Sequence, residues 1–308
     1  MKYKERSLLE FCRHLNIDLS NVQHDLSAIK KQIQLEFKAA KNGVISIGGS
    51  DYDFNFINDE FSNPNLKNIL KYEQWIQNID WLNDFINYAK FDFRYKLFTH
   101  NTNYDNLYRV LPVEKDTEEF RQYISPKMAK SFNTISKQLL DDNQFIKQKI
   151  IMNHLIFIKT EDHHTAFSFI SVFLNDVLKF LKNTNVNNYK QKNINLDRWS
   201  KPCVGAFLNA LPNQFDGFKK NYTVQMVGLV SEIFKIDLYF AYALSKELIK
   251  IDSVPHNIRK VMNKNHKVIE MMVAKGYKHP SDGSIMTVFY TILLALVLLG
   301  LLTSFFKC

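Results

Sequence analysis

The stretch LKNILKYEQWIQNIDWLNDFINY, residues 66–88, indicates the fold class. Its apolar side chains recur every three or four residues, which places them on one face of an α-helix. They are Leu66, Ile69, Leu70, Ile76, Ile79, Leu82 and Ile86. The same spacing recurs at 118–159, 166–181, 204–211, 223–234, 238–249 and 257–274. The sequence therefore predicts a mainly α fold.

Composition supports this prediction. Nine glycines and seven prolines in 308 residues are few for an all-β chain, which needs frequent turns. We expect one small β element near the N-terminus, because Val44–Ile47 and Asp51–Phe54 flank Gly48-Gly49 like the strands of a hairpin.

The predicted organisation has five parts. An N-terminal helical region with the hairpin covers 1–115, and a central helical region covers 116–182. Residues 183–196 are rich in Asn and Lys and are expected to form a polar linker. A C-terminal helical region covers 197–280, and 285–306 is set apart by its composition.

The segment IMTVFYTILLALVLLGLLTSFF, residues 285–306, has no charged residue and no proline. As a helix it would cross the roughly 30 Å of hydrocarbon in a bilayer. We therefore predict a single C-terminal transmembrane helix, with the lipid bilayer as a partner. The residues expected to anchor it include Ile285, Leu293, Leu296, Leu299, Leu302 and Phe306.

Flanking charges predict the orientation of this helix. Lysines and histidines precede it within a short distance, and only Lys307 follows it. The positive-inside rule then leaves the large N-terminal part in the cytoplasm. Because Met1–Leu15 is charged and lacks a long apolar region, we expect no signal peptide and a tail-anchored, single-pass membrane location.

The formal net charge of +9 allows binding to nucleic acid or to anionic lipid. Three widely separated cysteines predict no disulfide framework, which suits a reducing compartment. No motif predicts a cofactor.

In IGGSDYDFNF, residues 47–56, Asp51 and Asp53 would share one face of a strand and could bind a metal. The run locally resembles nucleotidyltransferases, with Asp92 as a third acid. In that family the Gly-Ser opens a helix well before the acids, whereas here Gly49-Ser50 abuts Asp51. We expect a hairpin turn, with Asp51 and Asp53 as the alternative metal ligands.

The run Glu161-Asp162-His163-His164 follows an apolar stretch. It resembles the third motif of DHH phosphoesterases, whose acids and histidines bind two metals. The upstream Asp-x-Asp motif of that family is absent, so we expect a polar turn that begins a helix.

Two Arg…His pairs, Arg94-x5-His100 and Arg259-x6-His266, lie in predicted helices. HEPN ribonucleases are all-α proteins with Arg-x4–6-His on a helix, where the histidine acts as base and the arginine holds the scissile phosphate. The second pair resembles this motif, which implies Arg259 and His266 as candidate catalytic residues. The alternative is a surface charge and a membrane-proximal histidine.

Residues 196–272 resemble the C-terminal winged-helix domain of RteC-type regulators of conjugative transposons. The matching features are Trp199, Ala210-Leu211, Phe234-Lys235-Ile236-Asp237-Leu238 and Arg259-Lys260. The resemblance implies a winged-helix-like region that binds DNA, with Arg259 and Lys260 as candidate phosphate contacts.

The function expected from these patterns is that of a membrane-anchored protein whose helical part binds a protein partner or forms a homo-oligomer. The layout resembles membrane-perturbing or pore-forming effectors of prokaryotic antiviral defence. The alternatives are an RteC-like DNA-binding regulator and a HEPN-like ribonuclease. Whether the chain is an enzyme is left open, with a non-enzymatic role preferred.

Overall fold

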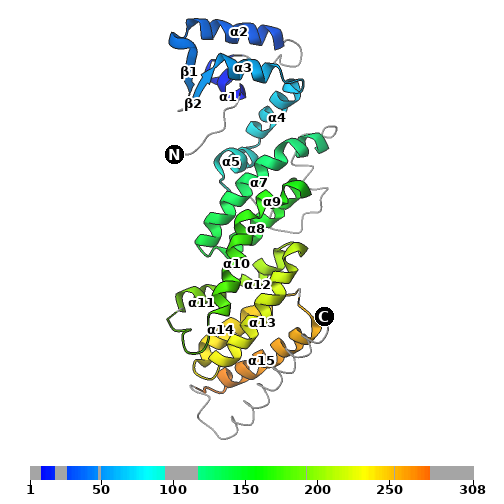
Figure 1. Ribbon diagram of the computed structural model, residues 1–308. Coiled ribbons are helices and arrows are strands. Elements are labelled where there is room, and N and C mark those ends of the chain that lie inside the picture. Colours follow the sequence, from blue (N-terminus) through cyan, green and yellow to red (C-terminus); the bar gives the residue numbers. More distant parts are fainter. Residues whose placement is uncertain are drawn as a thin grey trace. The chain divides into compact units, whose positions relative to one another are not determined.

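The computed structural model describes residues 8–17, 26–47, 50–93, 117–191, 193–252 and 254–277 (Figure 1). These residues are mainly helical, with one two-stranded antiparallel sheet. They divide into two units, one from Met1–Phe132 and Ile156–Ala166, the other from Asn133–Leu155 and Phe167–Cys308.

The first unit begins with a helical and β-hairpin layer (Figure 1). Its elements are α1 (Leu8–His14), α2 (Leu26–Ala39), the 3-10 turn η1 (Lys41–Gly43), β1 (Val44–Ile47), β2 (Ser50–Asp53) and α3 (Phe54–Phe61). The strands pair in the register Val44↔Asp53 to Ile47↔Ser50. Rings at the centre of this layer pack closely, with the Phe11 centroid 5.5 Å from that of Phe37 and 5.0 Å from that of Tyr52.

The strand β2 ends at Asp53 because that residue caps the next helix. Asp53 Oδ1 accepts a hydrogen bond from the Phe56 backbone N–H at 2.7 Å, which satisfies a free donor at the start of α3. Phe54 is therefore the first residue of a helix and not the end of the strand predicted from the sequence.

The rest of the first unit is built from longer helices. They are α4 (Leu66–Asn78), α5 (Asp80–Tyr88), most of α7 (Thr117–Asp141), the 3-10 turn η4 (Thr160–Asp162) and α9 (His163–Ala166). The predicted helix over 66–88 is two helices, since Ile79 has extended backbone angles between them. An aromatic cluster of Tyr72, Trp75, Phe120 and Tyr123 packs α4 against α7.

The second unit is helical throughout its described residues. Its elements are the end of α7, α8 (Phe145–Ile151), much of η3 (Met152–Phe157), α10 (Ser168–Lys182), α11 (Asn193–Ser200), α12 (Val204–Ala210), η5 (Asn213–Phe215), α13 (Asp216–Ile233), α14 (Leu238–Leu248) and α15 (His256–Ala274). Trp199 is 1% exposed and lies at the centre, with its ring centroid 5.7 Å from Phe145, 6.0 Å from Phe173 and 5.2 Å from Tyr222.

The sequence-based fold class needs one correction. No helix in the part of the chain that the structure describes is long and apolar enough to cross a membrane. Most of the described helices bury one face and carry polar or charged residues on the exposed face. The apolar segment 285–306, with the anchor residues predicted there, lies outside the described residues. We therefore withdraw the transmembrane and tail-anchored architecture.

Gly205 allows α12 to approach α14 very closely. A Cβ atom at this position would lie 2.7 Å from Lys250 Cβ and 2.8 Å from the Glu247 backbone oxygen. Real Cβ atoms do not come so near to backbone, so a larger residue would push the two helices apart.

Gly205→Ala is expected to destabilise the second unit by about 1–3 kcal/mol through this overlap. Gly228→Ala is the matched control, because nothing lies within 4 Å of a Cβ added there, inside α13. That change should stabilise by about 0.5–1 kcal/mol. Urea unfolding followed by Trp199 fluorescence, with Trp75 and Trp81 changed to Phe, reports on the second unit. Equal gains for both variants would contradict the packing constraint.

Candidate ligand-binding cavity

A cavity of about 780 Å³ lies within the first unit, lined by α1, β1, α4, α5 and α7. Most of its lining residues have polar or charged side chains. The aliphatic lining residues are Ile47 and Ile86; the others are Glu10, Arg13, His14, Glu73, Gln77, Asn83, Asn87, Tyr88, Lys127, Lys130 and Ser131. A cavity with this lining suits a polar ligand that forms hydrogen bonds on several sides.

Polar contacts hold α7 against its neighbours at the cavity. Glu73 Oε1 accepts hydrogen bonds from Lys127 Nζ and from the Tyr123 hydroxyl, each at 2.5 Å. The Ser131 hydroxyl donates to the Ile86 backbone oxygen at 3.0 Å. The first two bonds join α4 to α7 and the third joins α5 to α7. The cavity-lining helices α4 and α5 are therefore both held in place by α7.

The electrostatics of this region centre on Glu73. Its carboxylate is 7% exposed and is compensated by Lys127. Burial raises the pKa of the nearby Glu60 carboxyl; the negative charges of Glu73 and Asp59 raise it further, while Lys127 lowers it. A second carboxylate close to Glu73 is therefore disfavoured in its charged form.

The charged residues of the lining favour an anion. Glu73 is paired with Lys127, and the other ionisable lining residues are Arg13, His14 and Lys130 with one further carboxylate, Glu10. Arg13 is exposed and makes no ion pair with any residue that the structure describes. Arginine presents planar donors that match carboxylate and phosphate oxygens.

The two acids of the IGGSDYDFNF run have structural partners. Asp53 caps α3, and Asp51 Oδ1 accepts a hydrogen bond from the Ser46 hydroxyl across the hairpin at 2.5 Å. Gly48 and Gly49 lie outside the described residues. Within the described ranges, no group of three His, Cys, Asp or Glu side chains could hold a metal ion.

The Glu161–His164 run forms a turn at the start of α9. His164 Nδ1 lies 2.7 Å from the Glu161 backbone oxygen, and the buried Ser125 hydroxyl donates to Asp162 Oδ2 at 2.5 Å. Asp162 thus fastens this turn to α7 instead of facing the two histidines.

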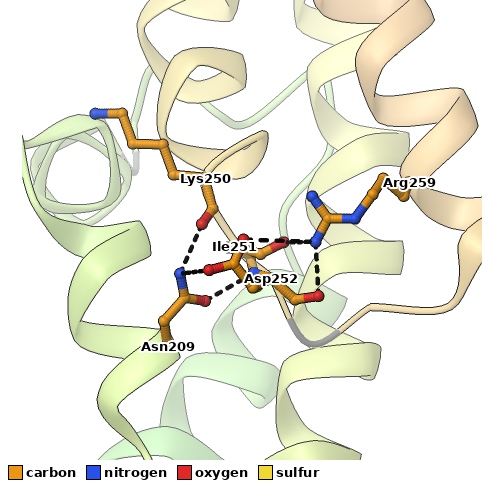
Figure 2. A network of polar contacts seen from close by, with 5 residues as sticks. All are labelled: Asn209, Lys250, Ile251, Asp252 and Arg259. Atoms are coloured by element: carbon orange, nitrogen blue, oxygen red, sulfur yellow. Dashed lines mark hydrogen bonds and ion pairs between the residues drawn. The ribbon is translucent and has the colours of Figure 1, made fainter.

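Arg259 is engaged by the loop between α14 and α15, as Figure 2 shows. Its Nη2 donates to the backbone oxygens of Ile251 and Asp252, the second at 2.6 Å. Asn209 closes the network from α12, since its Nδ2 donates to the Lys250 oxygen at 2.7 Å and to Asp252 Oδ2 at 2.8 Å. The guanidinium therefore holds a loop.

His266 lies two turns further along α15 and faces the protein interior. Its Nδ1 is 2.9 Å from the Ser245 hydroxyl, and its ring stacks on Tyr242 with centroids 5.6 Å apart. The structure does not bring Arg259 and His266 together. Lys260 is exposed, whereas Arg94 and His100 lie outside the described residues.

Sequence reasoning did not identify the cavity. Its lining comes from separate stretches, at 10–14, 47, 73–77, 83–88 and 127–131, and none of these carries a recognisable motif. Comparison with models of protein families, with curated proteins and with solved structures found no match to this chain.

Two buried histidines make the second unit sensitive to acid. Burial lowers the pKa of His154 to about 3, opposed by the Ile151 backbone oxygen, and burial also lowers the pKa of His266. The neutral rings are therefore favoured by folding. Their contribution to stability is complete above the ordinary histidine pKa of about 6.5 and is lost as pH falls below it.

We expect the second unit to lose about 2 kcal/mol of stability from His154 alone between pH 6.5 and pH 5. His154→Gln should flatten this part of the pH profile, and His256→Gln, at an exposed position, should leave it unchanged. Urea midpoints measured by Trp199 fluorescence across pH 5–8 provide the test. An unaltered slope in His154→Gln would contradict the assignment.

Proposed function

We propose that this chain is a helical binding protein whose first unit takes up a small anionic molecule. The observation that carries the proposal is the charge of the cavity lining. Arg13 and Lys130 come from different helices to one cavity, while the buried lining carboxylate, Glu73, is already neutralised by Lys127.

The sequence-based expectation is that the helical part binds a protein partner or forms a homo-oligomer, and this proposal instead assigns it a small anionic ligand. It does not use a membrane anchor. It also does not use Arg259 and His266 as a catalytic pair, since each has a separate partner in the second unit.

Phosphate and pyrophosphate are expected to bind the full chain and to raise its thermal unfolding temperature, since ligands that bind only the folded state stabilise it. Arg13→Gln should weaken this binding about tenfold or more, because a charge-assisted hydrogen bond is lost. Isothermal titration calorimetry measures the effect.

The matched control is Lys38→Gln, which removes one positive charge from the exposed side of α2, outside the cavity. It should bind both anions as the unchanged protein does. Equal affinity in Arg13→Gln and Lys38→Gln, or absence of binding by the unchanged protein, would refute the proposal.

A second candidate function is binding to nucleic acid through α15. Lys260, Lys264 and Lys267 are exposed and follow the spacing of one helical stripe. The acidic residue of α15, Glu270, follows Lys267 by three residues and so borders one end of this stripe. The RteC resemblance implies phosphate contacts from Arg259 and Lys260. Because Arg259 binds loop carbonyls, we propose that Lys264 and Lys267 contact phosphate together with Lys260.

The triple variant Lys260→Gln/Lys264→Gln/Lys267→Gln is expected to weaken binding to duplex DNA. It should also reduce the slope of log affinity against log salt by roughly one for each lysine removed. The control is Lys31→Gln/Lys38→Gln/Lys149→Gln, which removes the same charge from exposed positions on α2 and α8. Gel shifts over a salt series would speak against this function if both triples lost affinity alike.

A further inference from the structure

We infer that the anionic molecule is a nucleoside phosphate. Its phosphate would lie against the cationic residues of α1 and α7, and its base against Tyr88 and the amides of α4 and α5. The inference rests on the proposed function, because it assigns a ligand class to the same cavity.

The cavity lining contains two kinds of chemistry that come from different helices. Positive charge comes from α1 and α7, through Arg13 and Lys130, while Lys127 is paired with Glu73. Neutral amides come from α4 and α5, through Gln77 and the Asn83–Asn87 pair. An inorganic anion would use the first group alone. A ligand that uses both needs an anionic end and a neutral end with several donors and acceptors, as a nucleoside phosphate has.

The asparagines of α5 offer a donor beside an acceptor. Asn87 Nδ2 donates to Asn83 Oδ1 at 2.8 Å, one turn apart on the helix. This bond leaves Asn83 Nδ2 to donate and Asn87 Oδ1 to accept. Such a pair complements the adjacent acceptor and donor groups along the edge of a base.

Gln77 supplies a third amide that the protein itself does not satisfy. Its Oε1 is buried and has no hydrogen-bond partner among the described residues, which is unusual for a buried polar atom. Gln77 lines the cavity, and the terminal torsion of glutamine is soft. A small rotation would present its oxygen or its nitrogen to a ligand.

Tyr88 provides an aromatic surface at the same place. It is the last residue of α5, lines the cavity and is 41% exposed. Lys90 Nζ lies over its ring, 5.8 Å from the centroid, so a base would stack on the opposite face. Bases stack on exposed aromatic rings irrespective of their sequence identity. The volume of about 780 Å³ falls inside the range of roughly 300–1,000 Å³ typical of small-molecule sites.

The test compares three sets of probes by calorimetry on the full chain. These are the four ribonucleosides, their mono- and triphosphates, and inorganic phosphate and tripolyphosphate. At least one nucleotide is expected to bind about tenfold or more tightly than both its nucleoside and the inorganic anion of equal phosphate number. Tyr88→Leu should weaken that nucleotide about tenfold and leave the inorganic anion unchanged.

Tyr239→Leu is the matched control, since Tyr239 is 55% exposed on α14 and belongs to the second unit. It should bind as the unchanged protein does. Arg13→Gln should weaken nucleotide and inorganic anion together. These variants separate stacking from charge within one cavity.

The outcomes distinguish the two proposals. If inorganic anions bind as tightly as every nucleotide, or if Tyr88→Leu affects both alike, the nucleoside inference fails and anion binding stands. If no anion binds and nucleosides alone do, both the phosphate assignment and the proposed function fail. Absence of binding by every probe overturns both.

Discussion

The buried carboxylate of Glu73 is the constraint on which the first unit depends. A charge removed from water must find partners, and Glu73 finds them in Lys127 and Tyr123, both on α7. These hydrogen bonds fix the position of α7 along α4, next to the ring contact between Tyr72 and Phe120. Because Lys127 also lines the cavity, the contact that holds the helices together also defines the charge that a ligand meets.

In the second unit, the polar groups that need partners are backbone carbonyls of a loop. The backbone oxygens of Lys250, Ile251 and Asp252, in the loop between α14 and α15, accept hydrogen bonds from side chains. Arg259 and Asn209 supply the donors, as Figure 2 shows, and Gly205 lets α12 come close enough to α14 for Asn209 to reach that loop. An arginine that resembled part of a catalytic motif in the sequence therefore holds the loop between α14 and α15.

Local patterns in the sequence were informative where one stretch of chain decides its own structure. The two strands pair on either side of the Gly-Gly pair, as predicted from the sequence, and the amphipathic spacing predicted most helices. Helix boundaries were less predictable. Asp53 starts α3 by capping it, and Ile79 separates α4 from α5, although the apolar spacing of 66–88 continues through the break. The cavity could not be predicted, because Arg13, Glu73 and Lys130 reach its lining from three different helices, α1, α4 and α7.

The sequence by itself determined the mainly helical character and the hairpin, since both follow from the period of apolar side chains and from turn residues a few positions apart. Only the tertiary structure decided which charged residues are partners and which face a ligand. Arg259 and His266 share a helix yet face different surroundings, whereas Lys127 and Glu73 are 54 positions apart and share a hydrogen bond. The type of each side chain is known from the sequence, but its burial and its charged partners depend on residues that folding brings next to it.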